Sequence, residues 1–299
     1  MKDQNGHSGA LTAPAAKAEH PPVQRVAEVV GRRPVNAYTE LRLAAPEIAA
    51  TAVPGQFVAF AVGGPLSGNL LRRSIAIAGT GDGVVTVVVA AHGPGSTWLA
   101  GLQPGDVVDV VGPLGRPFPM PAPGTPALLV GGGYGAAALV GLAERLRATG
   151  SPVTAIAGAA SADRLCSVEE LGAVADEVVV TTDDGSAGRR GWVSEPAAEL
   201  IADVGVVYAC GPMGMLRAVG ELATAAGVPS YVAVEESMAC GIGVCMTCVL
   251  PVIGDDGRSR FARSCAEGPV FGGDRVRFAD VGKLPYDLVG ADAMGVVAP

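Results

Sequence analysis

Four cysteines in the last quarter of the chain constrain its fold more than any other feature. Cys240, Cys245 and Cys248 stand in the segment CGIGVCMTC with the spacing C-x4-C-x2-C, and Cys265 follows after sixteen intervening residues. This spacing is typical of the plant-ferredoxin type of 2Fe-2S site. The two glycines between the first two cysteines let the loop turn tightly and bring backbone N–H groups close to the sulfurs. The sequence therefore predicts an iron–sulfur site here.

Three alternatives for these cysteines stay open at this point. A zinc site made of four cysteines usually shows two C-x2-C pairs, and only one pair here has that spacing. Disulfides belong to oxidising compartments. Buried structural cysteines are the third alternative, and they explain Cys166 best.

The composition indicates a folded protein of more than one domain. The chain has 299 residues, of which 49% are hydrophobic and 17% charged, so it can bury a sizeable core. Its formal net charge is −8, which argues against a general nucleic-acid binder, because such proteins present a basic face.

Two segments bear on the location of the protein in the cell. Residues 1–22 are polar and rich in Ala and Pro without an apolar core, so we expect a disordered tail rather than a signal peptide. Residues 126–143 are uncharged, but their length is marginal for a membrane span, and they contain three consecutive glycines. We expect no membrane segment and a cytoplasmic protein.

The pattern of the chain divides it into three parts and a tail. Residues 23–122 contain short Val-rich runs separated by turn residues, which predicts an antiparallel β-barrel or sandwich; a short helical turn is expected in TWLAGLQPGD. Residues 123–235 alternate between strand and helix patterns, which predicts an α/β doubly wound parallel sheet. Residues 236–285 form a small part with the cysteines, and residues 286–299 show no clear pattern.

Glycine turns in the α/β part indicate a nucleotide site. The run GGGYG follows a buried strand and opens a helix, and helix N-termini with glycine turns accept phosphate. The segment Cys210-Gly211-Pro212 ends a later strand, where ligands of such sheets sit. Tight strand–helix packing is the structural alternative for the first feature, and an ordinary strand-to-helix turn for the second.

The nucleotide itself is only weakly indicated. An acidic residue about twenty positions after the glycine run would bind a ribose, but none is obvious at the end of the next strand. A 2′-phosphate would find only Arg164 there, which favours NAD over NADP.

An arginine pair in the first part offers a second phosphate site. Residues 70–77, LLRRSIAI, place Arg72 and Arg73 at the start of an apolar strand, and the planar guanidinium matches phosphate oxygens. The turn HGPGST, residues 92–97, begins a helix and is suited to the other side of a diphosphate. A solvated strand edge is the alternative.

Together these segments resemble the ferredoxin-reductase superfamily and, within it, the electron-transfer subunits of class 1B dihydroorotate dehydrogenases. The resemblance covers about residues 23–280 and rests on PGQFV, LLRRSIAI, GPLGRPF, GGGYG, TTDDGS, CGPMGML and EESMACGIGVCMTC, in that order. It implies a β-barrel for FAD, a doubly wound sheet for NAD and a small C-terminal 2Fe-2S domain.

The resemblance also implies roles for particular residues, and no catalytic acid or base is among them. The implied flavin-binding residues are Arg73, Ser74, Ile75, Ala76, Gly93, Gly95, Ser96 and Thr97. The implied NAD-binding residues are Gly131, Gly132, Gly133, Gly135, Cys210, Gly211 and Pro212. The implied cluster ligands are Cys240, Cys245, Cys248 and Cys265. Ala76 departs from the family pattern, which usually has Ser or Thr there, and Ala137 or Ala138 replaces a frequent Pro.

The implied activity is electron transfer in pyrimidine biosynthesis. Electrons would pass from the flavin of an FMN-containing catalytic dihydroorotate dehydrogenase subunit through the 2Fe-2S cluster and FAD to NAD+. The resemblance implies a hetero-oligomer, a heterotetramer in the family. Two alternatives remain: the flavin subunit of a hydrogenase or of a ferredoxin:NAD(P) oxidoreductase, and a metal-binding interaction module without enzymatic activity.

Overall fold

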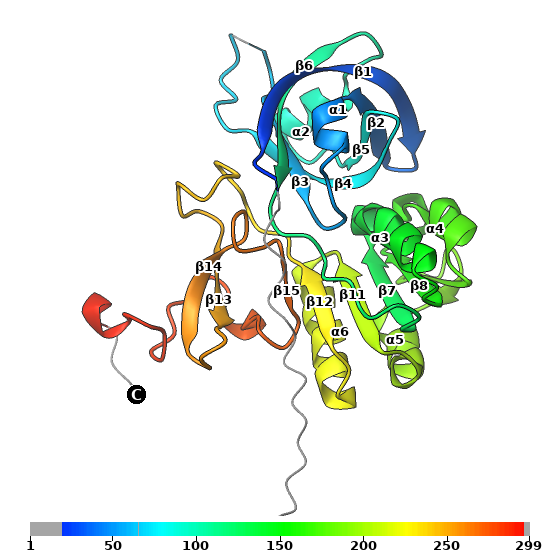
Figure 1. Ribbon diagram of the computed structural model, residues 1–299, viewed down its shortest axis with the longest axis vertical. Coiled ribbons are helices and arrows are strands. Elements are labelled where there is room, and N and C mark those ends of the chain that lie inside the picture. Colours follow the sequence, from blue (N-terminus) through cyan, green and yellow to red (C-terminus); the bar gives the residue numbers. More distant parts are fainter. Residues whose placement is uncertain (1–19, 65, 296–299) are drawn as a thin grey trace, which may run out of the picture.

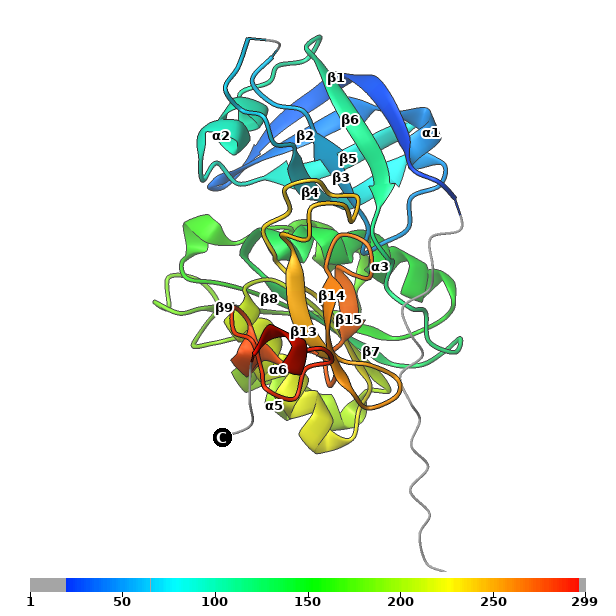
Figure 2. The ribbon, with the colours of Figure 1, turned by 90° about the vertical axis from the view of Figure 1, so that its left-hand side faces the viewer.

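The structure is a computed structural model that describes residues 20–64 and 66–295. Residues 1–19, which make up most of the segment expected to be a disordered tail, lie outside the described residues. A β-barrel stands above an α/β sheet with helices on both faces, and a small β-hairpin lies beside the sheet (Figure 1). A view at right angles shows the loop that precedes the hairpin reaching up to the barrel (Figure 2). The predicted fold class is confirmed.

In the described part of the chain, six antiparallel strands close into the barrel in the order β1-β2-β5-β4-β3-β6. The strands are β1 (Val23–Val35), β2 (Tyr38–Ala44), β3 (Phe57–Phe60), β4 (Arg73–Gly81), β5 (Val84–Val89) and β6 (Val107–Leu114). Two short helices accompany them, α1 (Pro46–Ala49) and α2 (Pro94–Ala100). Closure removes the free strand edges that a small open sheet would leave.

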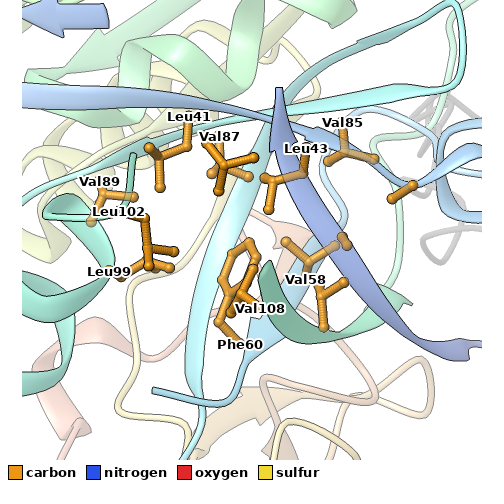
Figure 3. Packing of buried hydrophobic residues seen from close by; sticks show 14 of the residues in the cluster. Leu41, Leu43, Val58, Phe60, Val85, Val87, Val89, Leu99, Leu102 and Val108 are labelled. Atoms are coloured by element: carbon orange, nitrogen blue, oxygen red, sulfur yellow. The ribbon is translucent and has the colours of Figure 1, made fainter. Parts of the chain in front are cut away.

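Alternation of side chains fills the barrel. Leu41 and Leu43 point inward from β2, and the exposed Arg42 lies between them. Val85, Val87 and Val89 also point inward from β5, and Phe60 belongs to the same buried cluster (Figure 3). The two-residue period of a strand, together with the β-branched side chains, accounts for this arrangement.

Helix α2 begins earlier than the sequence pattern indicated. It starts at Pro94 and ends at Ala100, so it includes the PGS segment that the sequence analysis assigned to the preceding turn. Proline suits the first helical position, because its missing N–H would have no partner there. The Ser96 hydroxyl accepts hydrogen bonds from the backbone N–H groups of His92 and Gly93, at 3.0 and 3.1 Å, and fixes the start of the helix.

The α/β part contains a sheet with the order β10-β9-β8-β7-β11-β12-β15 among the described residues. Its strands are β7 (Ala127–Gly132), β8 (Val153–Ala159), β9 (Glu177–Thr182), β10 (Arg189–Arg190), β11 (Val206–Cys210), β12 (Ser230–Ala233) and β15 (Val270–Gly272). Its α-helices are α3 (Ala137–Ala148), α4 (Val168–Val174), α5 (Ser194–Leu200) and α6 (Met213–Ala226). Short 3-10 turns are η1 (Gly133–Ala136), η2 (Ala162–Arg164), η3 (Ile201–Asp203), η4 (Phe278–Asp280) and η5 (Asp292–Met294).

Every neighbouring pair from β10 to β12 is parallel, as predicted for a doubly wound sheet. Separate apolar clusters cover its two faces, one packed under α3 and α4 and the other under α5 and α6. The crossover from β7 to β8 through α3 and the reversal to β11 place the glycine turn at the point where the strand order changes direction. Ligands of such sheets bind outside the carboxyl ends of the strands at that point.

The cysteine-containing part adds strands that the sequence pattern did not reveal. Strands β13 (Val249–Ile253) and β14 (Ser259–Arg263) form an antiparallel hairpin. Strand β15 leaves this part and pairs antiparallel with β12, so it adds an edge strand to the sheet of the preceding part. Within residues 20–64 and 66–295, no helix has both the length and the apolar character needed to cross a membrane, as expected for residues 126–143.

Candidate functional site

The cysteine loop leads from β12 to the hairpin and has an unusual backbone. Gly241 and Gly243 have φ angles of 72° and 82°, which glycine adopts without strain, and Met246 has a φ of 61°. A positive φ at a non-glycine residue is uncommon, and residues with such strained backbone conformations cluster at functional sites. Cys265 joins the loop from the end of β14.

Backbone N–H groups of the loop point at the cysteine sulfurs. Gly243 N lies 3.1 Å from Cys265 Sγ, and Val244 N lies 3.3 Å from Cys240 Sγ. Cys265 N donates to Cys248 Sγ at 3.4 Å. Such donors stabilise sulfur that carries negative charge, as in a thiolate bound to iron. The glycine-rich loop therefore fits an iron–sulfur cluster in its backbone as well as in its cysteines.

The thiols form two pairs with different electrostatics. Burial opposes ionisation of Cys240, but N–H donors from Cys245, Ile242 and Val244 outweigh it and lower its pKa to about 6. Burial, then the neighbouring Cys248 thiol, raise the pKa of Cys265 to about 12. Cys240 thus interacts with Cys245, and Cys265 interacts with Cys248 and, more weakly, with Cys240. Two pairs of thiols suit a cluster of two irons held by four cysteines.

The cysteine spacing favours a binuclear cluster over a single zinc ion. A zinc site made of four cysteines usually shows two C-x2-C pairs, whereas only one pair here has that spacing.

The inner cysteine pair packs against the barrel. Cys248 and Cys265 are buried in one apolar cluster with Phe57 and Ala59 of β3 and Leu114 of β6. Met238, just before the cysteine loop, packs on the same cluster. The outer pair is less buried: Cys240 is partly buried and Cys245 exposed, and the apolar neighbours Ile242, Val244 and Met246 are 56%, 74% and 53% exposed.

A cavity of about 270 Å³ lies between the barrel and the carboxyl edge of the sheet. We call it the barrel cavity. Six of the residues proposed from sequence line it: Ser74, Ile75, Ala76, Ser96, Gly135 and Cys210. Phe57 and Met238 also line it, so they are shared between this cavity and the cysteine cluster. Sequence reasoning missed both, because apolar residues of a strand and a loop carry no sign of a shared wall.

Arg73 lies at the rim of this region, next to α2. A Cβ on Gly95 would lie 2.5–2.6 Å from its guanidinium, so a larger residue at position 95 would displace the arginine from this place. The guanidinium donates to the Leu71 carbonyl at 2.7 Å, and no carboxylate among residues 20–64 and 66–295 pairs with it. Arg72, in contrast, pairs with Asp109 at 2.5 Å. Gly93 precedes α2 and Thr97 lies within it, so these residues flank the barrel cavity without lining it.

A second cavity of about 530 Å³ opens along the carboxyl edge of the sheet. We call it the sheet cavity. Gly132, Gly133 and Pro212 line it. Gly131 and Gly211 do not line this cavity but lie in close contact with neighbouring backbone. A Cβ on Gly131 would lie 2.7 Å from the Ala136 Cα, and one on Gly211 would lie 2.9 Å from the Gly132 Cα. Close backbone packing therefore also accounts for these two glycines.

Three side chains line both cavities: His92, Tyr134 and Glu235. The Tyr134 ring lies 6.1 Å from His92 and 5.7 Å from Tyr38, ring centre to ring centre. Burial, then the Glu235 carboxylate, raise the pKa of the Tyr134 hydroxyl. Tyr134 lies within the run GGGYG and Glu235 begins the segment EESMACGIGVCMTC, but the sequence analysis gave neither side chain a role of its own. The two cavities thus meet at a small polar and aromatic junction.

The chain was compared with known proteins. Residues 235–277 match the sequence profile of a family described as the iron–sulfur cluster binding domain of dihydroorotate dehydrogenase B. Among solved structures, the chain is similar to one of an NADH-dependent reduced ferredoxin-NADP oxidoreductase, studied for flavin-based electron bifurcation. That likeness has 30% identity and a TM-score of 0.76, and it covers 86% of this chain and 91% of the other.

A second solved structure and two curated relatives give the same picture. A cytochrome P450 reductase from Amycolatopsis, GcoB, has 27% identity and a TM-score of 0.59, with 72% of this chain and 69% of the other covered. A probable dihydroorotate dehydrogenase B (NAD(+)), electron transfer subunit of Methanopyrus kandleri is 37% identical over 88% of this chain and 96% of its own length. The electron transfer subunit of Bacillus caldolyticus is 40% identical over 73% of this chain and 84% of its own.

The resemblance stated from sequence is confirmed by these relatives, whose similarity extends far beyond the cysteine loop. The chain belongs to the family of dihydroorotate dehydrogenase B electron transfer subunits.

Proposed function

We propose that this chain carries electrons from an FMN-containing catalytic dihydroorotate dehydrogenase subunit to NAD+, in the pyrimidine biosynthesis of the cytoplasm. It would do so with a 2Fe-2S cluster and FAD. We assign the flavin to residues 23–122, NAD to residues 123–235 and the cluster to residues 236–285, with tails at 1–22 and 286–299. When bound, the flavin exchanges hydride with nicotinamide and single electrons with the iron–sulfur cluster.

One observation carries this proposal: three sites lie in a row and share their walls. Phe57 and Met238 separate the cysteine cluster from the barrel cavity. His92, Tyr134 and Glu235 stand where the barrel cavity meets the sheet cavity. An order of cluster, flavin and nicotinamide is the order that passage of electrons from a partner to NAD+ requires.

The outer face of the cysteine loop supports a role for a partner. Ile242, Val244 and Met246 surround the exposed Cys245 with apolar side chains. Apolar residues gathered on a surface suit a protein–protein contact. A partner docked there would bring its own redox centre next to Cys240 and Cys245, which would be cluster ligands together with Cys248 and Cys265. We therefore expect a hetero-oligomer.

The barrel residues would hold the flavin without chemistry of their own. The β4 backbone at Ser74, Ile75 and Ala76 lines the barrel cavity and can position a planar ring. Arg73 has no carboxylate partner among the described residues and can bind the diphosphate together with the start of α2, where Gly93, Gly95, Ser96 and Thr97 lie. Ala76 offers no hydroxyl, so backbone groups must supply the polar contacts at that point.

The sheet residues would hold the nucleotide. Gly132 and Gly133 line the sheet cavity and would let the diphosphate approach the backbone, while Gly131 and Gly135 complete the turn. Pro212 lines the same cavity, and with Gly211 and with Cys210, which lines the barrel cavity, it would close the nicotinamide end. Hydride transfer needs alignment of donor and acceptor rather than an acid or base, so no catalytic residue is assigned. Cys210 is buried at this end, and burial raises its pKa to about 12, so its thiol stays neutral.

Reconstitution with the catalytic subunit tests the proposal. The chain is co-expressed with the dihydroorotate-oxidising subunit encoded in the same genome, and the purified complex is assayed for dihydroorotate-dependent reduction of NAD+. We expect co-purification and reduction of NAD+ that neither subunit performs alone. Failure of the complex to form, with NADH-driven reduction of a ferredoxin or of a hydrogenase partner instead, would favour the alternative reductase function.

Substitution of Arg73 tests the flavin site. Arg73→Gln is expected to weaken FAD binding by about tenfold to a hundredfold, because a hydrogen bond to a charged group contributes about 1.5–3 kcal/mol. The measurement is titration of the flavin-free protein with FAD. The matched control is Arg42→Gln, an exposed arginine on β2 whose side chain does not line the barrel cavity. Equal FAD affinity in both variants would place the diphosphate elsewhere.

A further inference from the structure

A charged pair brackets the last of the four cysteines. Arg263 ends β14 two residues before Cys265, and Glu267 follows two residues after it. The Glu267 carboxylate accepts hydrogen bonds from the Arg263 backbone N–H at 2.6 Å and from its Nε at 3.0 and 3.1 Å, and it also pairs with Nη2. The Arg263 carbonyl accepts hydrogen bonds from the N–H groups of Ala266 and Glu267, at 3.1 and 2.8 Å. Residues 263–267 therefore form a hydrogen-bonded turn that contains Cys265.

This turn is attached both to the barrel and to the hairpin. The backbone N–H of Arg116, just after β6, donates to the Gly268 carbonyl at 2.6 Å, and its Nε donates to the Ala266 carbonyl at 3.4 Å. On the hairpin side, the Ser264 N–H donates to the Cys248 carbonyl at 2.9 Å. The turn is thus a well-anchored support, and a side chain that extends from it can hold a neighbouring loop in place.

The Arg263 side chain extends from this turn to the outer part of the cysteine loop. Its Nη1 donates to the Gly243 carbonyl at 2.9 Å. The same peptide unit carries the N–H of Val244, which lies 3.3 Å from Cys240 Sγ. In a planar trans peptide the C=O and the N–H point in opposite directions, so a donor that holds the oxygen directs the N–H toward the sulfur. Arg263 therefore orients a hydrogen bond that it does not itself make.

Gly243 fits closely against the turn. A Cβ there would lie 3.1 Å from the Ala266 Cβ and 3.3 Å from Arg263 Nη1. The N–H groups of Gly243 and Val244 point at one inner and one outer cysteine, Cys265 and Cys240. The carbonyl between these two N–H groups is the one that Arg263 binds. Hydrogen bonds to the sulfurs help to set the reduction potential of an iron–sulfur cluster, so the alignment of these donors affects how readily it accepts an electron.

We propose that Arg263 is a positioning residue for the cluster: held by Glu267, it aligns the Val244 N–H with Cys240 and raises the potential at which the cluster is reduced. The charge of the guanidinium acts in the same direction, because a nearby positive charge favours an added electron. Glu267 opposes this charge effect but keeps the guanidinium in place. The inference rests on the proposed function, which assigns the 2Fe-2S cluster to the four cysteines, and it adds two residues that bind no metal.

The reduction potential of the cluster, followed by paramagnetic resonance over a series of set potentials, tests the proposal without turnover. In Arg263→Gln, we expect the ratio of reduced to oxidised cluster at a given potential to fall by about tenfold, which is a downward shift of roughly 59 mV for a one-electron couple. Arg263→Lys keeps the charge but lacks the planar fork that spans Glu267 and Gly243, so it should recover only part of the shift.

Glu267→Gln separates an electrostatic and orienting role from a merely structural one. It removes a negative charge and leaves an amide oxygen that can still accept a hydrogen bond from Arg263, so its potential should shift upward. General loosening of the loop would instead move Arg263→Gln and Glu267→Gln in the same direction. Release of iron to a chelator gives a second measure, and we expect it to be about tenfold faster in Arg263→Gln.

The matched control pair lies on the same hairpin. Arg260 of β14 pairs with Asp256 at 2.5 Å, and Arg260→Gln and Asp256→Asn should each leave the potential and the iron release unchanged. Shifts of the same sign in Arg263→Gln and Glu267→Gln, or wild-type potentials in both, would overturn the inference while leaving the function intact. Absence of iron and labile sulfide from the wild-type protein would overturn the proposed function itself.

Discussion

In Cys245→Ser, electron transfer to the catalytic partner is expected to fall by on the order of a hundredfold or more, because the cluster requires four cysteine ligands. NADH-driven reduction of a dye by the bound flavin should persist, since the barrel and sheet cavities contain no part of this residue. Of the four proposed cluster ligands, Cys245 is the best choice to remove. It is exposed, whereas Cys248 and Cys265 also pack on the barrel core.

Both activities can be measured on the same preparation. Iron and labile sulfide analysis and the paramagnetic resonance of the dithionite-reduced protein report the cluster, and flavin absorbance reports FAD. The matched control is Cys166→Ser, which replaces a buried cysteine outside the proposed cluster whose Sγ lies 3.5 Å from the Ser167 hydroxyl oxygen. Loss of dye reduction in Cys245→Ser with full flavin occupancy would contradict the separation of the two centres. So would undiminished transfer to the partner.

In Gly135→Ala, we expect the free energy of unfolding to drop by about 1–3 kcal/mol, as for overpacking of a tight interior. A Cβ on Gly135 would lie 2.6 Å from the Cys210 carbonyl oxygen and 2.8 Å from the Gly211 nitrogen. Both are backbone atoms at the end of β11, so no flexible side chain can move aside. The backbone must shift at the point where the glycine turn meets the nicotinamide end of the site.

The functional consequence should exceed the loss of stability. Displacement of this contact misaligns the nucleotide with the flavin, so flavin reduction by NADH is expected to slow by about tenfold or more even at temperatures where the variant is folded. Thermal unfolding and stopped-flow reduction measure the two effects. Gly172→Ala is the control, since a Cβ there meets open space within α4 and should stabilise the helix by up to about 1 kcal/mol. Wild-type reduction rates in Gly135→Ala would show that the contact has no role in alignment.

Much of this architecture could be predicted from the sequence because its signals are local. The cysteine spacing, the glycine run after a buried strand and the regular alternation of strands and helices each depend on neighbouring residues. What stayed hidden depends on contacts between distant segments. Strand β15 has three residues and no periodicity of its own, and it exists because β12 offers it an edge.

The candidate site shows the same contrast between local sequence signals and contacts that only the fold creates. Ser74, which was proposed for the flavin, lines one cavity together with Gly135 and Cys210, which were proposed for NAD, and their motifs gave no sign that these residues would meet. The sequence did not reveal that Asp183 lines the sheet cavity, because this follows from the lateral order of the strands and not from distance along the chain. Trp192 lines the same cavity and belongs to none of the motifs that the sequence analysis used.

The pairing of β15 with β12 has a consequence for evolution and for engineering. The four residues of β12 are all buried, and their outer neighbour comes from beyond the cysteines. A reductase shortened after residue 235 would leave this strand with an unpaired edge, a template for aggregation. The cysteine-containing part therefore cannot be removed without exposing β12. A chimera that exchanges this part must include a strand that pairs with β12 as β15 does.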